Sequence, residues 1–364
     1  MKRKTTTRIL FLAIHPRNSA PSHRFRFEQY IPFFESNGFR CTYSTILPTH
    51  DARFYYAKSS TMIKIWIGIK AFLRRFKDLL LVRQYDIVFI SRRAFLTEHM
   101  FFEWCISKLG VKIIFDLDDA VWIDALSDYN KKLGWLKGKP NTANIIKLSN
   151  LVIAGNSFLA KYSLQYTNKV ITIPTAIDTE IFSPSEPKHK KKIIIGWSGS
   201  FSTTWHLNLV TPALKKVKEK YGDRIGFKII GDPNYYNKEL EVKGVPWVLK
   251  TEVEDLRELD IGIMPLVDFD FAWGKCGLKG LTYMALEIPT LMSPVGVNSE
   301  IIKHGENGFL CNNEDEWVHY LSILIDQPEK RTELGKAGRE TVLSRYSILA
   351  NRDKYIDAFN QLLN

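Results

Sequence analysis

Apolar runs alternate with stretches of helical periodicity along most of the chain. In the first half, apolar runs at residues 8–14, 85–91, 112–115, 151–154 and 170–174 predict buried strands of a parallel sheet. In the second half, similar runs at residues 193–197, 227–231, 261–266 and 289–292 predict another sheet. Helical patterns at residues 23–37, 98–109, 205–221 and 252–259 supply crossovers between strands. The alternation predicts an α/β protein with two doubly wound parallel sheets.

Residues 62–82 predict a long amphipathic helix. Its apolar positions fall on one face at helical spacing, and most of its charged positions fall outside that face. The apolar positions are Met62, Ile65, Trp66, Ile69, Phe72, Leu73, Phe76, Leu79 and Leu80. Two interpretations remain open: a helix packed on the core with a solvated basic side, or a basic amphipathic helix that lies in a membrane interface.

The chain has 364 residues, which exceeds the usual size of one domain and predicts two domains of about 150–200 residues each. Residues 186–192, EPKHKKK, are polar and basic, and we interpret them as the linker between the domains. The last part of the chain, from about residue 314, predicts helices.

Cysteine usage and the N-terminal pattern indicate a reducing compartment. Cys41, Cys105, Cys276 and Cys311 are scattered and form no CxxC pair, so neither a disulfide framework nor a zinc site follows. The N-terminal segment has basic residues and then a short apolar run, which we interpret as the first strand and not as a signal peptide. No apolar run approaches the roughly 20 residues that span a bilayer. We therefore expect a cytoplasmic protein, with the cytosolic face of a membrane as a further location.

The net charge of +12 is compatible with nucleic acid, a membrane surface or anionic small substrates as partners. Because no helix-turn-helix, zinc-finger or RNA-binding motif is present, nucleic acid is not expected to be the partner.

Residues 268–310 contain the pattern that most directly suggests an anion site. A Gly/Lys turn at residues 274–279 precedes a short apolar helix at residues 281–286, and a helix N-terminus beside two lysines suits an anion. The alternative is an ordinary crossover with exposed lysines. A second loop of small residues, 198–204, follows the predicted strand at 193–197, as in many phosphate-binding crossovers.

The same residues carry a resemblance to a known family. The segment contains GKCG-x-K (Gly274 to Lys279), YMA (Tyr283 to Ala285), SPVG-x-N (Ser293 to Asn298) and HG-x-NGF (His304 to Phe309). This ordered series resembles the donor-binding segment of the retaining family-4 glycosyltransferases (glycosyl transferases group 1), in the branch that carries these motifs.

The resemblance implies a GT-B fold, in which two Rossmann-like doubly wound domains face each other across a cleft that holds the site. We expect an acceptor-side domain at residues 1–187, a nucleotide-sugar donor domain at residues 188–346, and a C-terminal helix, 347–364, that packs back on the first domain. The implied activity is that of a hexosyltransferase, which moves a sugar from a nucleotide diphosphate sugar to an acceptor hydroxyl. Retention at the anomeric carbon, no essential metal or other cofactor, and a role in surface polysaccharide or glycoconjugate assembly are also implied. The expected partners are the nucleotide-sugar donor and a sugar or lipid-linked sugar acceptor, with peripheral membrane contact through residues 62–82.

Site residues follow from the resemblance and from the cations available. Because the 198–204 loop lacks the Arg and Lys that most relatives place there, we expect lysines elsewhere to balance the charge of the diphosphate. The residues predicted to bind the donor are Gly199, Ser200, Ser202, Thr203, Lys275, Cys276, Gly277, Lys279 and Thr282. Lys275, Asp118 and Asp119 are the predicted catalytic residues, the two aspartates contacting the sugar or the acceptor hydroxyl. Arg24 and Arg26, near a predicted helix start, are predicted on the acceptor side.

Two observations leave other functions open. The wider family has two glutamates spaced E-x₇-E that bind donor hydroxyls, and Gly274 and Thr282 stand at those positions here. A binding-only homologue of the same fold is therefore an alternative. The IIFDLDD segment also resembles the nucleophile motif of haloacid-dehalogenase phosphatases, which would make Asp116 a phosphoryl acceptor. The usual Thr of that motif is missing, and the glycosyltransferase branch itself has a DxDDA-x-W segment, which matches Asp116 to Trp122.

Overall fold

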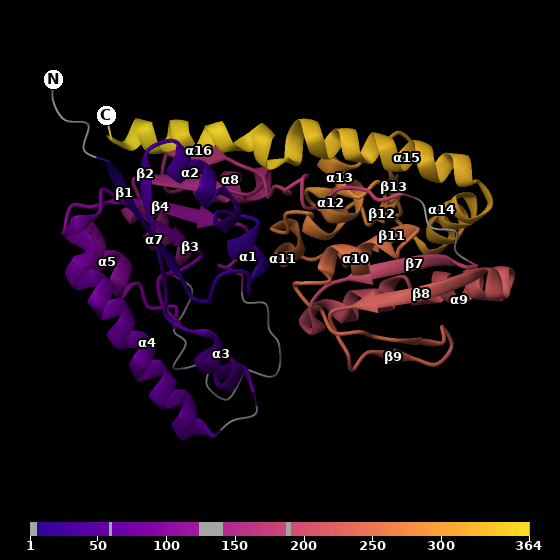
Figure 1. The fold of residues 1–364 in the computed structure, drawn as a ribbon, viewed down its shortest axis with the longest axis horizontal. Helices are drawn as coiled ribbons and strands as arrows, with labels where there is room; N and C mark the ends of the chain where they lie inside the picture. The colour runs from indigo at the N-terminus through magenta and orange to yellow at the C-terminus, as the bar shows by residue number, and fades with distance from the viewer. Residues whose placement is uncertain (1–5, 58–59, 124–140, 187–190, 364) are drawn as a thin grey trace. The chain divides into compact units, whose positions relative to one another are not determined.

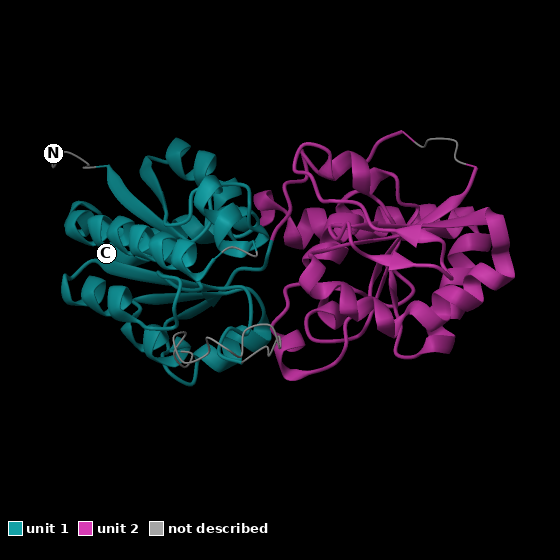
Figure 2. Cartoon of the chain, turned by 90° about the horizontal axis from the view of Figure 1, so that it is seen from below, with its two compact units in different colours: residues 1–175, 351–364 teal, residues 176–350 magenta. Residues whose placement is uncertain are grey.

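The computed structural model describes residues 6–57, 60–123, 141–186 and 191–363. They form two compact units, unit 1 with residues 1–175 and 351–364 and unit 2 with residues 176–350 (Figure 2). Residues 187–190 of the predicted linker lie outside the described residues. Each unit is built around its own parallel sheet (Figure 1).

Unit 1 contains a six-stranded parallel sheet in the order β2-β1-β3-β4-β5-β6. The strands are β1 (Thr7–Ala13), β2 (Phe39–Thr45), β3 (Ile87–Ser91), β4 (Lys112–Leu117), β5 (Leu151–Ala154) and β6 (Val170–Thr172). Strands β3 and β5 are buried along their whole length, as expected for a parallel sheet with helices on both faces. The strands predicted from apolar runs are confirmed here, and β2 is an addition whose residues are mostly only half-buried.

The helices of unit 1 cover this sheet. They are α1 (Pro21–Arg24), α2 (Ile31–Ser36), α3 (Thr49–Tyr56), α4 (Thr61–Leu81), α5 (Phe101–Lys108), α7 (Thr142–Leu148) and α8 (Ser157–Ser163), with 3₁₀ turns η1 (Glu28–Tyr30) and η2 (Val82–Gln84). The core between α2 and the sheet is aromatic: the Phe11 ring stacks on Phe27 at 5.1 Å and on Phe34 at 6.2 Å between centroids.

The C-terminal helix α16 (Ile348–Leu363) completes this aromatic core, because its residues from 351 onward belong to unit 1. The ring of Phe359 meets Phe34 edge-on at 5.0 Å, and Tyr355 lies 4.8 Å from Tyr30. The Tyr355 hydroxyl also donates a hydrogen bond of 2.6 Å to the Arg26 carbonyl oxygen.

Unit 2 contains a five-stranded parallel sheet in the order β13-β12-β11-β7-β8 and a two-stranded antiparallel ribbon. The strands are β7 (Ile193–Ser198), β8 (Ile225–Ile230), β11 (Ile261–Met264), β12 (Thr290–Met292) and β13 (Phe309–Leu310), with β9 (Tyr236–Asn237) and β10 (Val242–Lys243) in the ribbon. The helices are α9 (Thr211–Tyr221), α10 (Glu252–Arg257), α11 (Asp270–Trp273), α12 (Leu278–Ala285), α13 (Asn298–Ile301), α14 (Glu314–Asp326) and α15 (Pro328–Thr341). The turns are η4 (Phe201–Leu209), η5 (Gly222–Arg224) and the π-helical η6 (Val342–Tyr346).

Two predicted helices are interrupted, and a proline lies at the start of the last segment of each. The helix expected at residues 23–37 is split into α1, η1 and α2, and Pro32 occupies the first turn of α2. The helix expected at residues 205–221 becomes η4 followed by α9, with Pro212 in the first turn of α9. Proline has no N–H and its ring clashes with the carbonyl four residues earlier, so it begins a helix and cannot continue one.

Helix α4 is present where it was predicted, but its apolar face does not pack on the core. The buried positions are Ile67, Ala71 and Arg75, which are spaced four residues apart and form one stripe. Met62 and Leu80, on the predicted apolar face, are 80% and 71% exposed. The interpretation of this face as a core-packing surface is therefore wrong.

Both sheets contain a point at which the strand order reverses. In unit 1 it lies between β1 and β3, and in unit 2 between β7 and β11. Ligands of open α/β sheets bind at the carboxyl ends of the strands beside such a point, because the loops there diverge to opposite faces. The loops after β1, β3, β7 and β11 are thus the places at which to look for a site.

Candidate functional site

In unit 2, the loop after β7 brings a Gly/Ser/Thr segment to the switch point. Gly199 is tied to the sheet by its N–H, which donates to the Ile230 carbonyl at 2.9 Å. The Ser200 and Ser202 hydroxyls are 2.8 Å apart, and the Thr203 hydroxyl donates to the Ser200 carbonyl at 2.9 Å. These predicted donor residues therefore lie together in one turn at the start of η4.

Lys279 approaches the same turn from the first turn of α12. A β-carbon at Gly199 would lie 2.5 Å from Lys279 Cε and 2.6 Å from the Trp197 ring, so only glycine allows this approach. The Lys279 ammonium lies 5.1 Å from the centroid of the Trp197 ring, within range of a cation–π interaction. Lys279 already belongs to α12, so the turn predicted at residues 274–279 ends earlier than expected.

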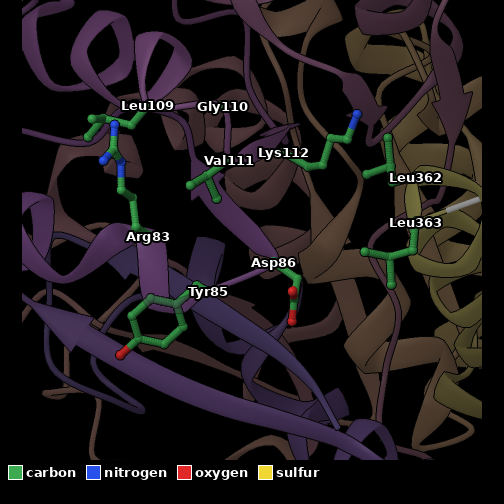
Figure 3. Close-up of a pocket in the computed structure, with 9 residues that line it drawn as sticks. All are labelled: Arg83, Tyr85, Asp86, Leu109, Gly110, Val111, Lys112, Leu362 and Leu363. Carbon is green, nitrogen blue, oxygen red and sulfur yellow. The ribbon is translucent and has the colours of Figure 1, made fainter. Parts of the chain in front are cut away.

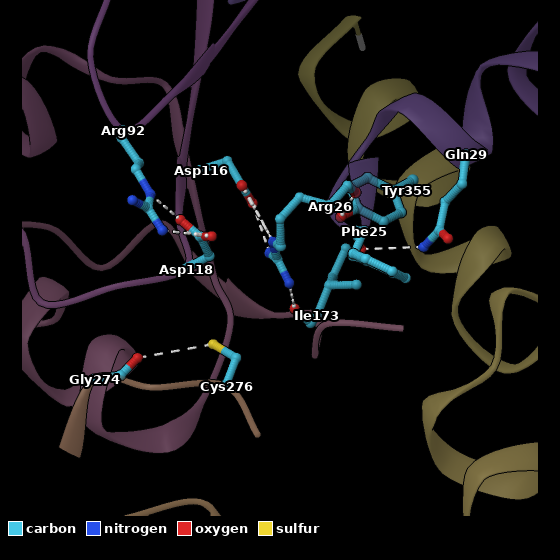
Figure 4. A network of polar contacts seen from close by, with 10 residues as sticks. All are labelled: Phe25, Arg26, Gln29, Arg92, Asp116, Asp118, Ile173, Gly274, Cys276 and Tyr355. Carbon is cyan, nitrogen blue, oxygen red and sulfur yellow. Dashed lines mark hydrogen bonds and ion pairs between the residues drawn. The ribbon is translucent and has the colours of Figure 1, made fainter. Parts of the chain in front are cut away.

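The start of α12 has the geometry of an anion site. Gly277 precedes the helix at φ +69°, and no side chain caps the N-terminus. The first N–H groups of α12 thus lie beside Lys279, and Lys275 is four residues earlier in the chain. The Lys275 ammonium is 4.5 Å from the Phe271 ring, and the Cys276 thiol donates to the Gly274 carbonyl at 3.8 Å (Figure 4).

His206 connects the two loops at the switch point of unit 2. It lies in η4, is 3% exposed, and its Nδ1 accepts a hydrogen bond of 3.2 Å from the Val267 N–H, just after β11. Burial and then the nearby Lys279 and Lys275 lower the pKa of His206 to about 4. The imidazole is therefore neutral near pH 7, mainly because it is buried, and the two lysine charges act in the same direction. The sequence analysis did not select His206; its position in the helix after a Gly/Ser loop was the available signal.

Several residues of the motifs named in the sequence analysis form side-chain hydrogen bonds to the backbone of neighbouring loops. The Ser293 hydroxyl accepts from the Leu266 N–H at 2.9 Å, and the Asn298 amide donates to the Ser293 carbonyl at 2.9 Å. His304 Nδ1 accepts from the Leu310 N–H at 3.1 Å, and the Asn307 amide oxygen accepts from the Lys303 N–H at 2.8 Å. The predicted donor residue Thr282 behaves similarly: it is 6% exposed and its hydroxyl donates to the Lys279 carbonyl at 2.7 Å.

In unit 1, the predicted residues Arg26 and Asp116 form a buried ion pair. Both side chains are fully buried, and the Arg26 guanidinium donates to both Asp116 carboxylate oxygens at 2.6–3.2 Å (Figure 4). Its remaining nitrogen donates to the Ile173 carbonyl at 2.6 Å. Burial raises the pKa of Asp116, and the Arg26 charge acts in the opposite direction.

This pair corrects two predictions. Asp116 lies inside β4 and not past its end, and a carboxylate buried beneath an arginine is not placed to attack a phosphoryl group, so the phosphatase alternative fails. Arg26 points into the core, so it has no exposed guanidinium for an acceptor. Arg24 is half-buried, and its guanidinium lies 4.5 Å from the Phe25 ring.

Asp118 and Asp119 lie at the carboxyl end of β4, as predicted. Asp118 accepts hydrogen bonds of 2.5 and 2.9 Å from Arg92, and an Asp119 oxygen lies 3.4 Å from the same guanidinium (Figure 4). Arg92 follows β3 and has φ +62°. The sequence analysis missed it, although the argument used for Asp118, a polar residue just after a buried strand, applies equally to the SRR segment at residues 91–93.

Two histidines lie beside this group. The His15 and His23 rings are 5.7 Å apart, and the His23 Nδ1 lies 3.5 Å from the Tyr43 hydroxyl. Burial, followed by the charges of Arg92 and Arg93, lowers the pKa of His15 to about 4. Burial is also the main cause that lowers the pKa of His23 to about 3. Both imidazoles are therefore neutral near pH 7.

The neutral state of His23 predicts a measurable pH dependence of stability. The unfolded chain binds a proton at this residue below its ordinary pKa of 6.5, whereas the folded protein does so only near pH 3. The free energy of unfolding therefore falls as the pH drops from 7, and His23 accounts for up to about 2 kcal/mol of this fall by about pH 5. Urea unfolding at pH 7 and pH 5 should show a smaller fall in the free energy of unfolding for His23→Gln than for the parent protein. The exposed His99→Gln variant is the control. An equal fall in the free energy of unfolding for all three proteins would contradict the assignment.

The described residues offer no clear site elsewhere. An open pocket of about 330 Å³ lies at the amino-terminal ends of β3 and β4, lined by residues that include Tyr85, Asp86, Lys112 and Leu363 (Figure 3). This is the sheet edge opposite the switch point. Within the described ranges, no group of three or more His, Cys, Asp or Glu side chains is arranged to hold a metal ion. Across the same ranges, no helix is long and apolar enough to cross a membrane.

Comparison with known proteins gives a match for the part of the chain that contains Lys275 and Lys279. The family model "Glycosyl transferases group 1" matches residues 178–341. The matched segment is a little under half of the chain. It includes the loop after β7, His206, Lys275 and Lys279, so all of these residues lie in the part of the chain that resembles glycosyl transferases group 1.

One curated relative and two solved structures extend the comparison. Glycosyltransferase 1 domain-containing protein 1 of Xenopus tropicalis is 29% identical over 119 residues, which are 33% of this chain and 34% of that protein. The chain therefore matches about a third of the relative's length. A glycosyltransferase from Rickettsia africae ESF-5 superimposes with a TM-score of 0.70 at 15% identity, over 99% of each chain. Anabaena Alr3699/HepE, solved in complex with UDP and glucose, superimposes with a TM-score of 0.66 at 14% identity, over 98% of this chain and 100% of that one.

At these identities the structural matches establish the fold. The two parallel α/β sheets and these neighbours identify it as GT-B, with two Rossmann-like domains. The predicted fold class is thereby confirmed, and so is the relation to glycosyl transferases group 1. The family-4 subtype, the particular motif branch and the role of each site residue remain predictions.

Proposed function

We propose that the chain transfers a sugar from a nucleotide diphosphate sugar to an acceptor hydroxyl. The observation that carries this proposal is the convergence of Lys279, the Gly199 turn and the start of α12 at the switch point of unit 2. A diphosphate needs cations and N–H donors, and both are present there. The Anabaena neighbour, which was solved with UDP and glucose, supports a nucleotide sugar as the donor.

The chemical task is to stabilise the diphosphate as it leaves. In the proposed reaction, Lys279 and Lys275 balance its growing negative charge, and the N–H groups at the start of α12 donate to its oxygens. We propose that these cations make a divalent metal unnecessary. Neutral His206 holds the two loops together. It adds no negative charge that would compete with the diphosphate for the two lysines. Retention at the anomeric carbon is part of the proposal and follows the family resemblance.

On the acceptor side, we propose a role for the group at the carboxyl end of β4. The Arg92 guanidinium fixes the orientation of the Asp118 carboxylate through two hydrogen bonds. Asp118 and Asp119 would then accept hydrogen bonds from sugar or acceptor hydroxyls, and we propose Arg24, in the same unit, as a further acceptor-side residue. A hydroxyl-bearing acceptor in surface polysaccharide or glycoconjugate assembly fits carboxylates of this kind, and the cytoplasm is the proposed location.

Ligand-dependent stabilisation of the purified chain tests the proposal. We expect one class among UDP-, GDP- and ADP-sugars to raise the free energy of unfolding by about 2.7 kcal/mol at a hundredfold excess over its Kd. The shift should be equal with Mg²⁺ and with EDTA. Stabilisation only with Mg²⁺ would overturn the proposal that donor binding needs no divalent metal.

The binding-only alternative rests on Gly274 and Thr282, which replace the family's two glutamates, and on Thr282 being buried. It predicts stabilisation by a nucleotide sugar or a sugar without turnover. Release of UDP, GDP or ADP from the stabilising donor in the presence of acceptor sugars would rule this alternative out. If no donor stabilises the chain, the transferase proposal fails.

A further inference from the structure

Helix α4 has its polar and apolar sides reversed relative to an ordinary surface helix. At about 100° per residue, Ile67, Ala71 and Arg75 define the side that faces the protein, and the opposite side is apolar. On that opposite side Met62 is 80% exposed, Trp66 59%, Leu73 60% and Leu80 71%. A soluble helix normally buries such a stripe and exposes its charges.

The side facing the protein is held by Arg75, which is 1% exposed. Its guanidinium donates to the Ala94 carbonyl at 2.7 Å, the Ala13 carbonyl at 2.9 Å and the Asp78 carboxylate at 2.8 Å. The Ala13 and Ala94 carbonyls lie outside α4, so these bonds fix the rotation of the helix about its axis: turning it would leave a buried charge without them. The outward direction of the apolar stripe is therefore determined by the fold.

Neighbouring helices extend the exposed apolar surface. On α5, Phe101 is 47% and Trp104 48% exposed, and the Phe72 ring of α4 lies 6.5 Å from that of Phe101. On α3, which also packs against α4, Tyr56 is 62% exposed. Figure 1 shows α4 and α5 next to each other on the outside of unit 1. We call the exposed apolar residues of α3, α4 and α5 the apolar surface.

Cations accompany the apolar surface. Helix α4 contains five basic residues, Lys64, Lys70, Arg74, Arg75 and Lys77, against the single acidic residue Asp78. In the helical projection, Lys70 and Lys77 fall along one edge of the apolar stripe, and the Lys70 ammonium is 5.8 Å from the Trp66 ring. Long lysine side chains in this position can extend toward an anionic boundary while their stems cover apolar surface.

We propose that the apolar surface docks unit 1 on the surface of an anionic lipid bilayer, with α4 lying in the interface. Apolar side chains would enter the acyl boundary, Trp66 and Trp104 would occupy the headgroup level, and Lys70 and Lys77 would meet lipid phosphates. A second copy of the chain is a poorer occupant, since joining two such faces brings basic edges of the same sign together. We propose a peripheral contact with the bilayer surface, since no described helix is suited to cross the bilayer. The proposal does not depend on glycosyl transfer.

Vesicle flotation with the full chain tests the proposal without any donor. Phosphatidylcholine vesicles, plain or with about a third phosphatidylglycerol, are the probes. The protein should float with the anionic vesicles at low salt and less at high salt. Leu73→Gln should reduce the bound fraction about tenfold or more, whereas Leu349→Gln, at a leucine that is 55% exposed on another helix, should bind like the parent. The double variant Lys70→Gln with Lys77→Gln should reduce the salt dependence.

Each remaining outcome is decisive. A parent protein that does not float with anionic vesicles at low salt overturns the proposal. Equal binding of Leu73→Gln and Leu349→Gln overturns the role of α4. Concentration-dependent self-association that Leu73→Gln abolishes, without vesicle binding, assigns the apolar surface to a second copy instead. Unfolding curves of the variants establish that they are folded before flotation is compared.

Discussion

Replacing Arg26 with alanine is expected to lower the free energy of unfolding by about 3–5 kcal/mol, because it leaves the buried Asp116 carboxylate without its counter-charge. Three hydrogen bonds join the two side chains, and a fourth joins Arg26 to the Ile173 carbonyl, so no water-exposed partner is available to take over. The loss should appear as a lower urea midpoint with an unchanged slope. Few single substitutions in this chain should cost as much.

The exposed Arg40→Ala variant is the matched control, and its effect should stay within about 0.5 kcal/mol. A double variant in which Arg26 and Asp116 are replaced by Met and Leu should recover much of the loss, because it removes both charges and keeps volume in the core. If Arg26→Ala unfolds like Arg40→Ala, the ion pair is not buried in the way described.

Replacing Lys279 with methionine is expected to weaken binding of the nucleoside diphosphate product and to lower kcat/KM about 100-fold or more. Methionine keeps an unbranched stem over the Trp197 ring and removes only the charge, so a packing defect is not the expected cause. Calorimetric titration with the stabilising nucleotide, together with initial rates, measures both effects. Lys243→Met, on the exposed edge of the β9–β10 ribbon, is the control.

A second readout separates the position of Lys279 from its function. Lys279 is one of the causes that lower the pKa of His206, so His206 should titrate at a higher pH in Lys279→Met, as followed by NMR. An unchanged titration would show that Lys279 does not lie beside His206. A raised pKa with unchanged nucleotide affinity would place Lys279 correctly and remove it from the donor site.

The sequence was most informative where burial is complete. Strands such as β3 and β5 are apolar on both faces, so a short apolar run was sufficient to predict them. The loops after β4, β7 and β11 were also predicted, since polar and small residues follow these runs directly. The two interrupted helices were predictable in principle from Pro32 and Pro212, which the helical periodicity concealed.

Other features depend on contacts between distant parts of the chain. Arg26 and Asp116 are separated by 90 residues, so no local pattern indicates that they neutralise each other. Periodicity gave the apolar face of α4 correctly but not its direction, because that depends on which partners Arg75 finds. His206 likewise becomes distinctive only when α12 brings Lys279 beside it.

The division of the chain into units has a consequence for its synthesis. Unit 1 needs residues 351–364, which supply Tyr355 and Phe359 to its aromatic core, yet residues 176–350 of unit 2 are made before them. At about 5–20 residues per second, ribosomes need roughly 10 to 35 s for that interval. During that interval Phe34 and Tyr30 lack their contacts with Tyr355 and Phe359, while the residues of unit 2 are synthesised. The part translated first is therefore expected to be the part that finishes folding last.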